Sequence, residues 1–158
     1  MVLRGRVIGK LRNWGSLLAL LLLTSSVSVV GQSHASQHKP CTRAEAVKAE
    51  QEAGYLKNWN AVYASFGRYH HCDSGATAEG YSDTIAKLFA NEWRNVETAK
   101  RLMTKDPLFA KFVLSHIDVT WNFENGSKVD ENARLHCPAN AKRLCDQIRA
   151  RLKEARGK

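Results

Sequence analysis

The sequence has little that would indicate a β-sheet, a membrane-spanning helix or a metal-dependent enzyme. Apart from residues 119–123, no segment of useful length alternates apolar and polar side chains as a half-buried strand does. The longest strictly apolar run, residues 17–23, falls far short of the roughly 20 residues that a membrane span requires. The motifs H-E-x-x-H and C-x-x-C are absent. We therefore expect a helical protein with no assembled catalytic motif and no cofactor.

The N-terminal segment has no acidic residue, and the first one in the chain is Glu45. Four basic side chains precede the apolar run, and small residues around Gly31 and Ala35 follow it. This order is typical of a secretory signal peptide. We predict a signal peptide at residues 1–35, a single domain at residues 36–158, and a mature protein in the periplasm or secreted. The alternative is that the leader is not cleaved and remains as a membrane anchor. The four basic residues are Arg4, Arg6, Lys10 and Arg12.

The formal net charge of the whole chain is +9, and the leader holds four of the unmatched basic residues. Most of the remaining excess lies in residues 128–158. Two interpretations stay open: a solvated helix face, or a surface that binds anionic lipid, wall polymer or an acidic protein. No aromatic residue interleaves with these charges, so nucleic acid is not an expected partner.

Helical periodicity runs through almost all of the remaining chain. Thr42 followed by Glu45 forms a capping box, which predicts a helix that begins near Arg43. In the second half of this helix, apolar residues recur every three or four positions and would share one face. We predict one unbroken helix over residues 43–70. Gly54 has a low helix propensity, but no loop residues surround it and the pattern continues on both sides. The apolar stripe consists of Tyr55, Trp59, Val62, Phe66 and Tyr69.

Further helices complete the predicted fold. A second stripe covers residues 81–103, and Asp106 with Pro107 predicts the start of a third helix. A turn at residues 125–127 precedes two more helices, of which the last has an apolar stripe over residues 141–152. The predicted fold class is all-α, a small single-domain bundle of four to five helices with one or two disulfides. The residues predicted to be buried together are Trp59, Phe66, Phe89, Phe112 and Ile148.

Four cysteines follow the leader, and in an oxidising compartment they are disulfide candidates before they are metal ligands. An unbroken helix over residues 43–70 would be roughly 40 Å long, so Cys41 and Cys72 could not pair. If Cys41 and Cys72 each paired with one of the other two cysteines, Cys137 and Cys145 would also have to lie roughly 40 Å apart. The extended chain between Cys137 and Cys145 reaches only roughly 28 Å, which excludes both of these pairings. Either the first helix bends back, or its ends fray substantially, or at most one bridge forms. Cys137 with Cys145 is feasible, and Cys72 with one of them is the competing bridge.

A metal or small-ligand site is an alternative function. His70 and His71 adjoin one cysteine and His136 adjoins another, and zinc sites use these residue types. Successive helical residues point about 100° apart, which disfavours His70 and His71 as a joint clamp. His116 lies on an apolar face and is expected to be a core histidine, with Asp118 as its hydrogen-bond partner or as a local cap.

Polar residues gather between positions 73 and 83. Asp73 and Ser74 are interpreted as helix caps, because such side chains satisfy the free N–H groups of a first turn. Glu79 and Asp83 lie deeper in the helix, where they are candidates for binding a partner. The predicted partner-binding residues are Glu79, Asp83, Arg149, Arg151 and Lys153.

In its leader, its size and its cysteine-bearing helices, the chain resembles small helical proteins that bacteria export to the periplasm. Some of these are immunity proteins against secreted toxins, although no motif here identifies a family. We expect an exported, non-catalytic protein that binds a protein partner, as an inhibitor or immunity protein. The alternatives are a metal or small-ligand protein that uses the His and Cys clusters, and a binder of anionic surfaces through the basic C-terminal helix.

Overall fold

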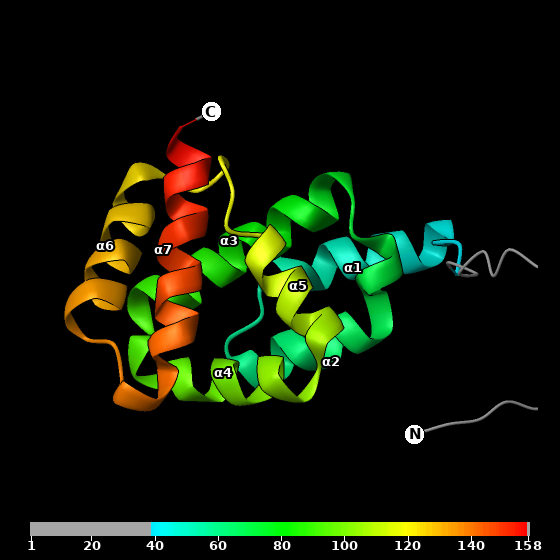
Figure 1. The fold of residues 1–158 in the computed structure, drawn as a ribbon. Coiled ribbons are helices and arrows are strands. Elements are labelled where there is room, and N and C mark those ends of the chain that lie inside the picture. The colour runs from blue at the N-terminus through cyan, green and yellow to red at the C-terminus, as the bar shows by residue number, and fades with distance from the viewer. Residues whose placement is uncertain (1–38, 158) are drawn as a thin grey trace, which may run out of the picture. The chain divides into compact units, whose positions relative to one another are not determined.

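The computed structural model describes residues 39–157, so the predicted signal peptide lies outside the described residues. The regular elements of this part are all helical, which confirms the predicted all-α class (Figure 1). None of the helices found there is both long and apolar enough to cross a membrane. The predicted count of four to five helices is too low for residues 39–157, because two of the predicted helices are broken. The elements are α1 (Arg43–Ala53), α2 (Trp59–Tyr69), η1 (His70–Cys72), α3 (Gly75–Asn91), η2 (Trp93–Asn95), α4 (Val96–Lys105), α5 (Pro107–Ser115), α6 (Phe123–Leu135), η3 (Ala139–Ala141) and α7 (Lys142–Arg156).

The predicted unbroken helix over residues 43–70 is wrong. Helix α1 ends at Ala53, whose carbonyl oxygen accepts a hydrogen bond of 2.6 Å from Thr84 Oγ1 on α3. Helix α2 then begins with its own cap, because the Asn58 side chain accepts from the backbone N–H of Ala61 at 2.9 Å. Tyr55 lies in the connection and is exposed rather than on the buried stripe.

The reversal between α1 and α2 brings Cys41 next to Cys72, and the two form a disulfide with a Cα–Cα distance of 5.0 Å. This pairing overturns the exclusion that followed from a straight first helix. Cys137 and Cys145 form the second disulfide, with a Cα–Cα distance of 6.2 Å, as the sequence allowed. Two disulfides are typical of a protein that folds in an oxidising compartment outside the cytosol.

The helix predicted over residues 81–103 is also divided. Helix α3 ends at Asn91, and the 3₁₀ turn η2 redirects the chain into α4. Glu92 accepts a hydrogen bond of 3.2 Å from the Asn95 side chain, and Trp93 Nε1 donates to the carbonyl oxygen of His136 at 2.9 Å. The apolar stripe continues across this turn because both helices face the same core, so periodicity alone did not reveal the break.

The predicted start of a helix at Pro107 is confirmed. Asp106 Oδ1 accepts from the backbone N–H groups of Leu108 and Phe109, at 3.0 and 3.1 Å. Proline at the next position loses nothing, because its missing N–H would have no helical partner there.

The predicted turn at residues 125–127 lies inside a helix instead. Helix α6 begins earlier, because Asn122 Oδ1 accepts from the backbone N–H of Asn125 at 2.8 Å. Gly126 is buried in the helix, where a β-carbon would contact Leu152 of α7 at 3.9 Å. Of the extended piece considered at residues 119–123, residues 119–122 form turns and an irregular connection, and Phe123 is the first residue of α6.

Helix α3 lies between the α1–α2 side of the domain and the α6–α7 pair, and it contacts both α1 and α6 (Figure 1). The aromatic core forms around it. Trp59 packs on Phe89 at 4.6 Å between ring centroids, and Phe112 packs on Phe66 at 5.0 Å. The five residues predicted to be buried together all belong to this core, and Ile148 joins it from α7.

The contact between α1 and α3 depends on a glycine. A β-carbon at Gly80 would lie 3.0 Å from Ala53 Cβ and 3.0 Å from the backbone nitrogen of Gly54. Both separations are shorter than the roughly 3.5–4.0 Å at which non-bonded atoms pack best. A side chain at position 80 would therefore push α1 away from α3.

We expect Gly80→Ala to destabilise the protein, because the usual overpacking cost of about 1–3 kcal/mol exceeds the gain of up to about 1 kcal/mol from helix propensity in α3. Gly67→Ala is the matched control, since no atom lies within 4 Å of a β-carbon there. Gly67 is inside α2, so this control should raise stability by up to about 1 kcal/mol. Urea denaturation of both variants checks the prediction, and equal effects at the two positions would contradict it.

Candidate functional site

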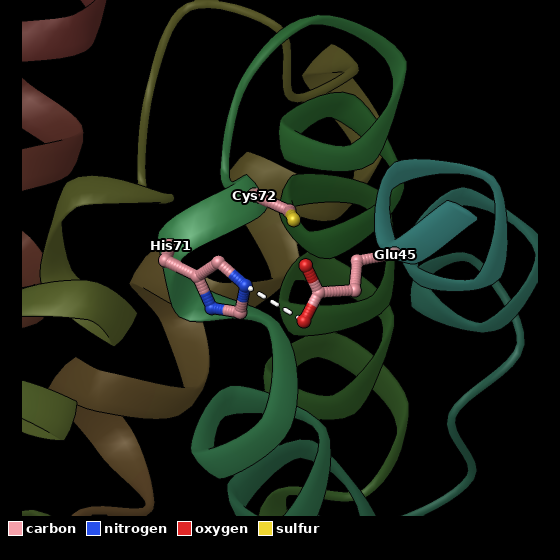
Figure 2. A group of neighbouring side chains, drawn as sticks. All are labelled: Glu45, His71 and Cys72. Atoms are coloured by element: carbon pink, nitrogen blue, oxygen red, sulfur yellow. Dashed lines mark ion pairs between the residues drawn. The ribbon is translucent and has the colours of Figure 1, made fainter. Parts of the chain in front are cut away.

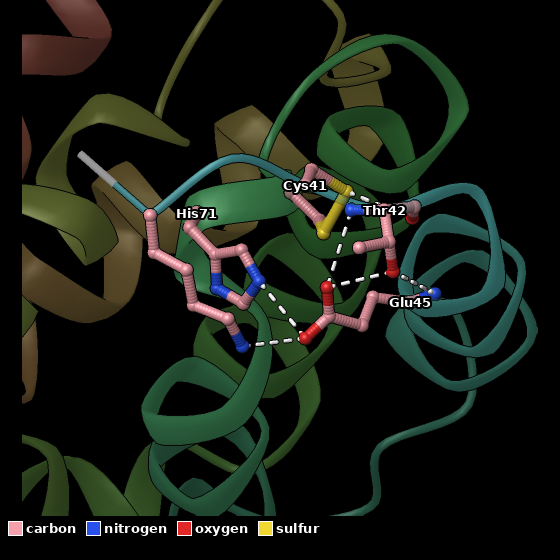
Figure 3. Close-up of a disulfide and its surroundings, with 6 residues drawn as sticks. Cys41, Thr42, Glu45 and His71 are labelled. Carbon is pink, nitrogen blue, oxygen red and sulfur yellow. Dashed lines mark hydrogen bonds and ion pairs between the residues drawn. A yellow bond between two sulfur atoms is a disulfide. The ribbon is translucent and has the colours of Figure 1, made fainter.

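The first candidate site surrounds the Cys41–Cys72 disulfide, where the start of α1 meets η1 (Figures 2 and 3). Ligand-type atoms of Glu45, His71 and Cys72 all lie within 4.8 Å of one another. Because the sulfur of Cys72 is bonded to Cys41, the oxidised chain presents only a carboxylate and an imidazole at this corner. We call these four residues the disulfide corner.

Glu45 is held by the capping box that the sequence predicted. Its Oε2 accepts from the Thr42 hydroxyl at 2.8 Å and from the Thr42 backbone N–H at 3.1 Å, while its Oε1 pairs with Lys39 (Figure 3). The hydrogen bond from Lys39, followed by those from Thr42, lowers the pKa of the Glu45 carboxyl from 4.5 to about 2. The carboxylate is therefore ionised throughout the neutral and mildly acidic range.

The imidazole of His71 is buried, with 4 % of its side chain exposed. Its Nε2 points at Glu45 Oε1 from 3.4 Å (Figure 2), a contact without hydrogen-bond geometry. Within residues 39–157, this nitrogen has no hydrogen-bond partner. Burying a polar atom in this way costs free energy, so a group that satisfied Nε2 would be bound favourably.

The three histidines proposed as metal ligands do not share one environment. His70 Nδ1 bonds the carbonyl oxygen of Phe66 at 2.9 Å, whereas His71 faces Glu45. His136 belongs to the connection before α7, where its carbonyl oxygen accepts from Trp93. Of the three, only His71 contributes to a cluster of metal-ligating side chains in the part of the chain that the structure describes.

His116 is a core histidine, as predicted, but its ring partners differ from the expected one. Nε2 lies 3.2 Å from Asp73 Oδ2, and Nδ1 lies 2.9 Å from Ser82 Oγ. Ser82 Oγ in turn donates to Asp118 Oδ2 at 3.0 Å, so Asp118 is one residue removed from the imidazole. Asp73 thus pairs across the fold instead of capping α3, and Ser74 makes no side-chain cap bond either.

Asp73, His116 and Ser82 include the residue types of a hydrolytic triad. A nucleophilic serine must be reachable by substrate, and Ser82 is only 2 % exposed. The network joins the start of α3 to the end of α5, which favours a structural role.

The second candidate site lies where α3 meets the connection into α6. Glu79 and Asp83, both predicted to bind a partner, line a cleft of about 230 Å³ together with Trp121. Trp121 Nε1 is buried without a hydrogen-bond partner among residues 39–157. Asp83 forms an ion pair of 2.6 Å with Lys87 on the same helix, and both side chains remain about half exposed. We call the cleft residues Glu79, Asp83, Ala86, Thr120, Trp121, Asn122 and Asn125 the acidic cleft.

Two large apolar side chains adjoin the acidic cleft in sequence. Val119 is 63 % exposed and Phe123 is 84 % exposed, and the residues between them include Thr120 and Trp121 of the cleft. Sequence reasoning missed Trp121 and Phe123, because they lie on no helical stripe. An aromatic pair in a segment rich in turn residues was the signal that could have indicated them.

The basic residues predicted to bind a partner have internal contacts. Arg149 pairs with Asp130 on α6 at 3.4 Å. Arg151 Nε donates to the carbonyl oxygen of Leu114 at 3.0 Å and so ties α7 to the end of α5. Lys153 is exposed. The three side chains are therefore not equivalent members of one free surface.

Comparison with known protein families, curated proteins and solved structures gave no significant match to this chain.

Glu45→Gln tests the electrostatics of the disulfide corner. Because the folded-state pKa is depressed, ionised Glu45 stabilises the protein above pH 4.5, and this stabilisation is lost as the pH falls toward 2. The variant should be less stable than the parent at pH 7, and the two should converge near pH 2. Glu50→Gln, at an exposed position on the same helix, is the control. Thermal unfolding as a function of pH checks this, and parallel curves for parent and Glu45→Gln would contradict it.

Proposed function

We propose that this protein is exported to the periplasm or beyond, and that it binds a protein partner there without catalysing a reaction. The binding surface is the acidic cleft with the exposed side chains of Val119 and Phe123. Its occupant is a basic segment of the partner that carries at least one apolar side chain. In this role the protein acts as an inhibitor or immunity protein.

The observation that carries the proposal is the exposure of Phe123, at 84 %, directly after Asn122 of the cleft that Glu79 and Asp83 line. Single exposed apolar residues are common on protein surfaces. A grouping with an aromatic ring, a neighbouring Val119 and a half-buried Trp121 is the composition that protein interfaces favour. The site thus offers both an apolar anchor and a means of selecting a cation.

Charge defines the expected partner. Glu79 and Asp83 give the cleft a negative character, and a partner lysine or arginine can compete with Lys87 for Asp83 because that ion pair is exposed. The internal contacts of Arg149 and Arg151 favour this surface over the basic helix as the docking site.

Matched variants test the surface. The protein is immobilised and exposed to envelope and secreted fractions, and a captured protein is then purified and its affinity measured. Phe123→Ala and Glu79→Lys should each weaken binding at least about tenfold, the loss expected for a central interface contact. Leu108→Ala is the control, because Leu108 is 68 % exposed on α5. Each substituted side chain is exposed, so folding stability should change by less than about 0.5 kcal/mol.

Affinity should also fall with salt, since exposed charges are screened over about 8–10 Å at physiological ionic strength. Failure to recover a stoichiometric protein partner would count against the proposal. Equal losses for Phe123→Ala and Leu108→Ala would show that binding uses another surface.

A further inference from the structure

The disulfide corner holds four side chains of the kinds that bind zinc. The ligand atoms of Glu45, His71 and Cys72 lie within 4.8 Å of one another, and Cys41 Sγ is bonded to Cys72 Sγ (Figures 2 and 3). While the sulfurs are bonded to each other, neither is a thiolate. Reduction would release two thiolates beside an imidazole and a carboxylate, which is a complete tetrahedral ligand set.

The buried imidazole is an independent sign of a ligand. His71 Nε2 is directed at Glu45 and has no hydrogen-bond partner within residues 39–157. Only 4 % of the His71 side chain is exposed, so water does not readily reach this nitrogen. A metal ion bound by both groups would give the nitrogen a partner at the separation of 3.4 Å that the two atoms already have. His70, its neighbour, is exposed and uses Nδ1 to bond the Phe66 carbonyl oxygen.

We infer that reduction of the Cys41–Cys72 disulfide converts the disulfide corner into a zinc site with Cys41, Cys72, His71 and Glu45 as ligands. A dithiol or a phosphine supplies the two electrons. With a phosphine, water provides the oxygen of the phosphine oxide and the two protons of the new thiols. Zn²⁺ then displaces those protons as it binds both sulfurs. This inference does not depend on the proposed partner-binding function.

The required movement is small. Tetrahedral zinc with bonds of about 2.3 Å to sulfur places two sulfurs about 3.8 Å apart. The Cα atoms of Cys41 and Cys72 are already 5.0 Å apart, so side-chain rotation can provide that separation. Glu45 needs to exchange only Lys39 for the metal at Oε1, since Thr42 binds the other oxygen.

Access for the reductant comes from one side. Cys41 is exposed, whereas Cys72 is buried. An incoming thiolate or phosphine can therefore reach the sulfur of Cys41, and Cys72 leaves as the thiolate nearest His71. Two thiolates with one imidazole and one carboxylate favour Zn²⁺ over Mg²⁺ or Ca²⁺, which prefer oxygen ligands.

The test uses protein without a histidine tag, carrying Cys137→Ser and Cys145→Ser so that the disulfide corner holds the remaining cysteines. After phosphine reduction, Co²⁺ is added as a spectroscopic probe and is then displaced by Zn²⁺. We expect thiolate-to-cobalt absorption and about one equivalent of bound zinc in the reduced form, against less than about a tenth in the oxidised form. His71→Gln should weaken binding at least about tenfold, whereas the matched His70→Gln should not.

A second measurement covers the case in which the double serine variant does not fold. In the reduced parent protein, Zn²⁺ should slow the alkylation of Cys41 and Cys72 and leave the alkylation rates of Cys137 and Cys145 unchanged. The inference is wrong if no thiolate absorption appears with folded protein, or if all four cysteines are alkylated at equal rates with and without zinc. Equal affinity of His71→Gln and His70→Gln would also overturn it.

Discussion

The close packing of α1 on α3 is the constraint on which the N-terminal half of the fold depends. At Gly80 the two backbones approach so closely that a β-carbon would contact Ala53 at 3.0 Å. Thr84 fixes the end of α1 by bonding the Ala53 carbonyl oxygen. With α1 held there, the chain must turn back before α2, and only this reversal brings Cys41 to Cys72 and Glu45 to His71. The first disulfide and its surroundings are thus consequences of a helix contact that needs a residue without a side chain.

Local signals were sufficient where the structure depends on neighbours in the chain. The capping box at Thr42 and the start signal at Asp106 were both correct, because each is satisfied within three residues. Apolar stripes identified the core for the same reason. They failed at residues 54–58 and at Glu92, because helices that face one core keep the same stripe across a turn. The caps at Asn58 and Asn122 were not predicted, because the apolar stripe over residues 55–69 and the turn residues at 125–127 indicated other helix boundaries.

The candidate sites depend on pairs that are distant in sequence. Geometric reasoning on the cysteines correctly stated that two disulfides and a straight first helix were incompatible, and the helix was the wrong premise. Nothing local indicates that Glu45 faces His71, or that Asp73 rather than Asp118 bonds His116. Glu79 and Asp83 were noticed for their charge. The aromatic wall of their cleft comes from Trp121, in a connection about 40 residues further along the chain, and could not be assigned to them from the sequence.

The Cys41–Cys72 disulfide closes a covalent ring over a sequence separation of 31 residues, which contains both α1 and α2. In the loop-entropy model such a ring destabilises the unfolded chain by about 3–4 kcal/mol, and the shorter ring closed by Cys137 and Cys145 does so by about 2–3 kcal/mol. The exposed connection of α1 to α2, including Lys57, lies inside the larger ring. A protease that cut there would open the ring without releasing a fragment, since the two pieces would remain joined by sulfur and by the packing of α1 on α3. An exposed loop in the N-terminal half of the molecule can therefore be cut without dividing it.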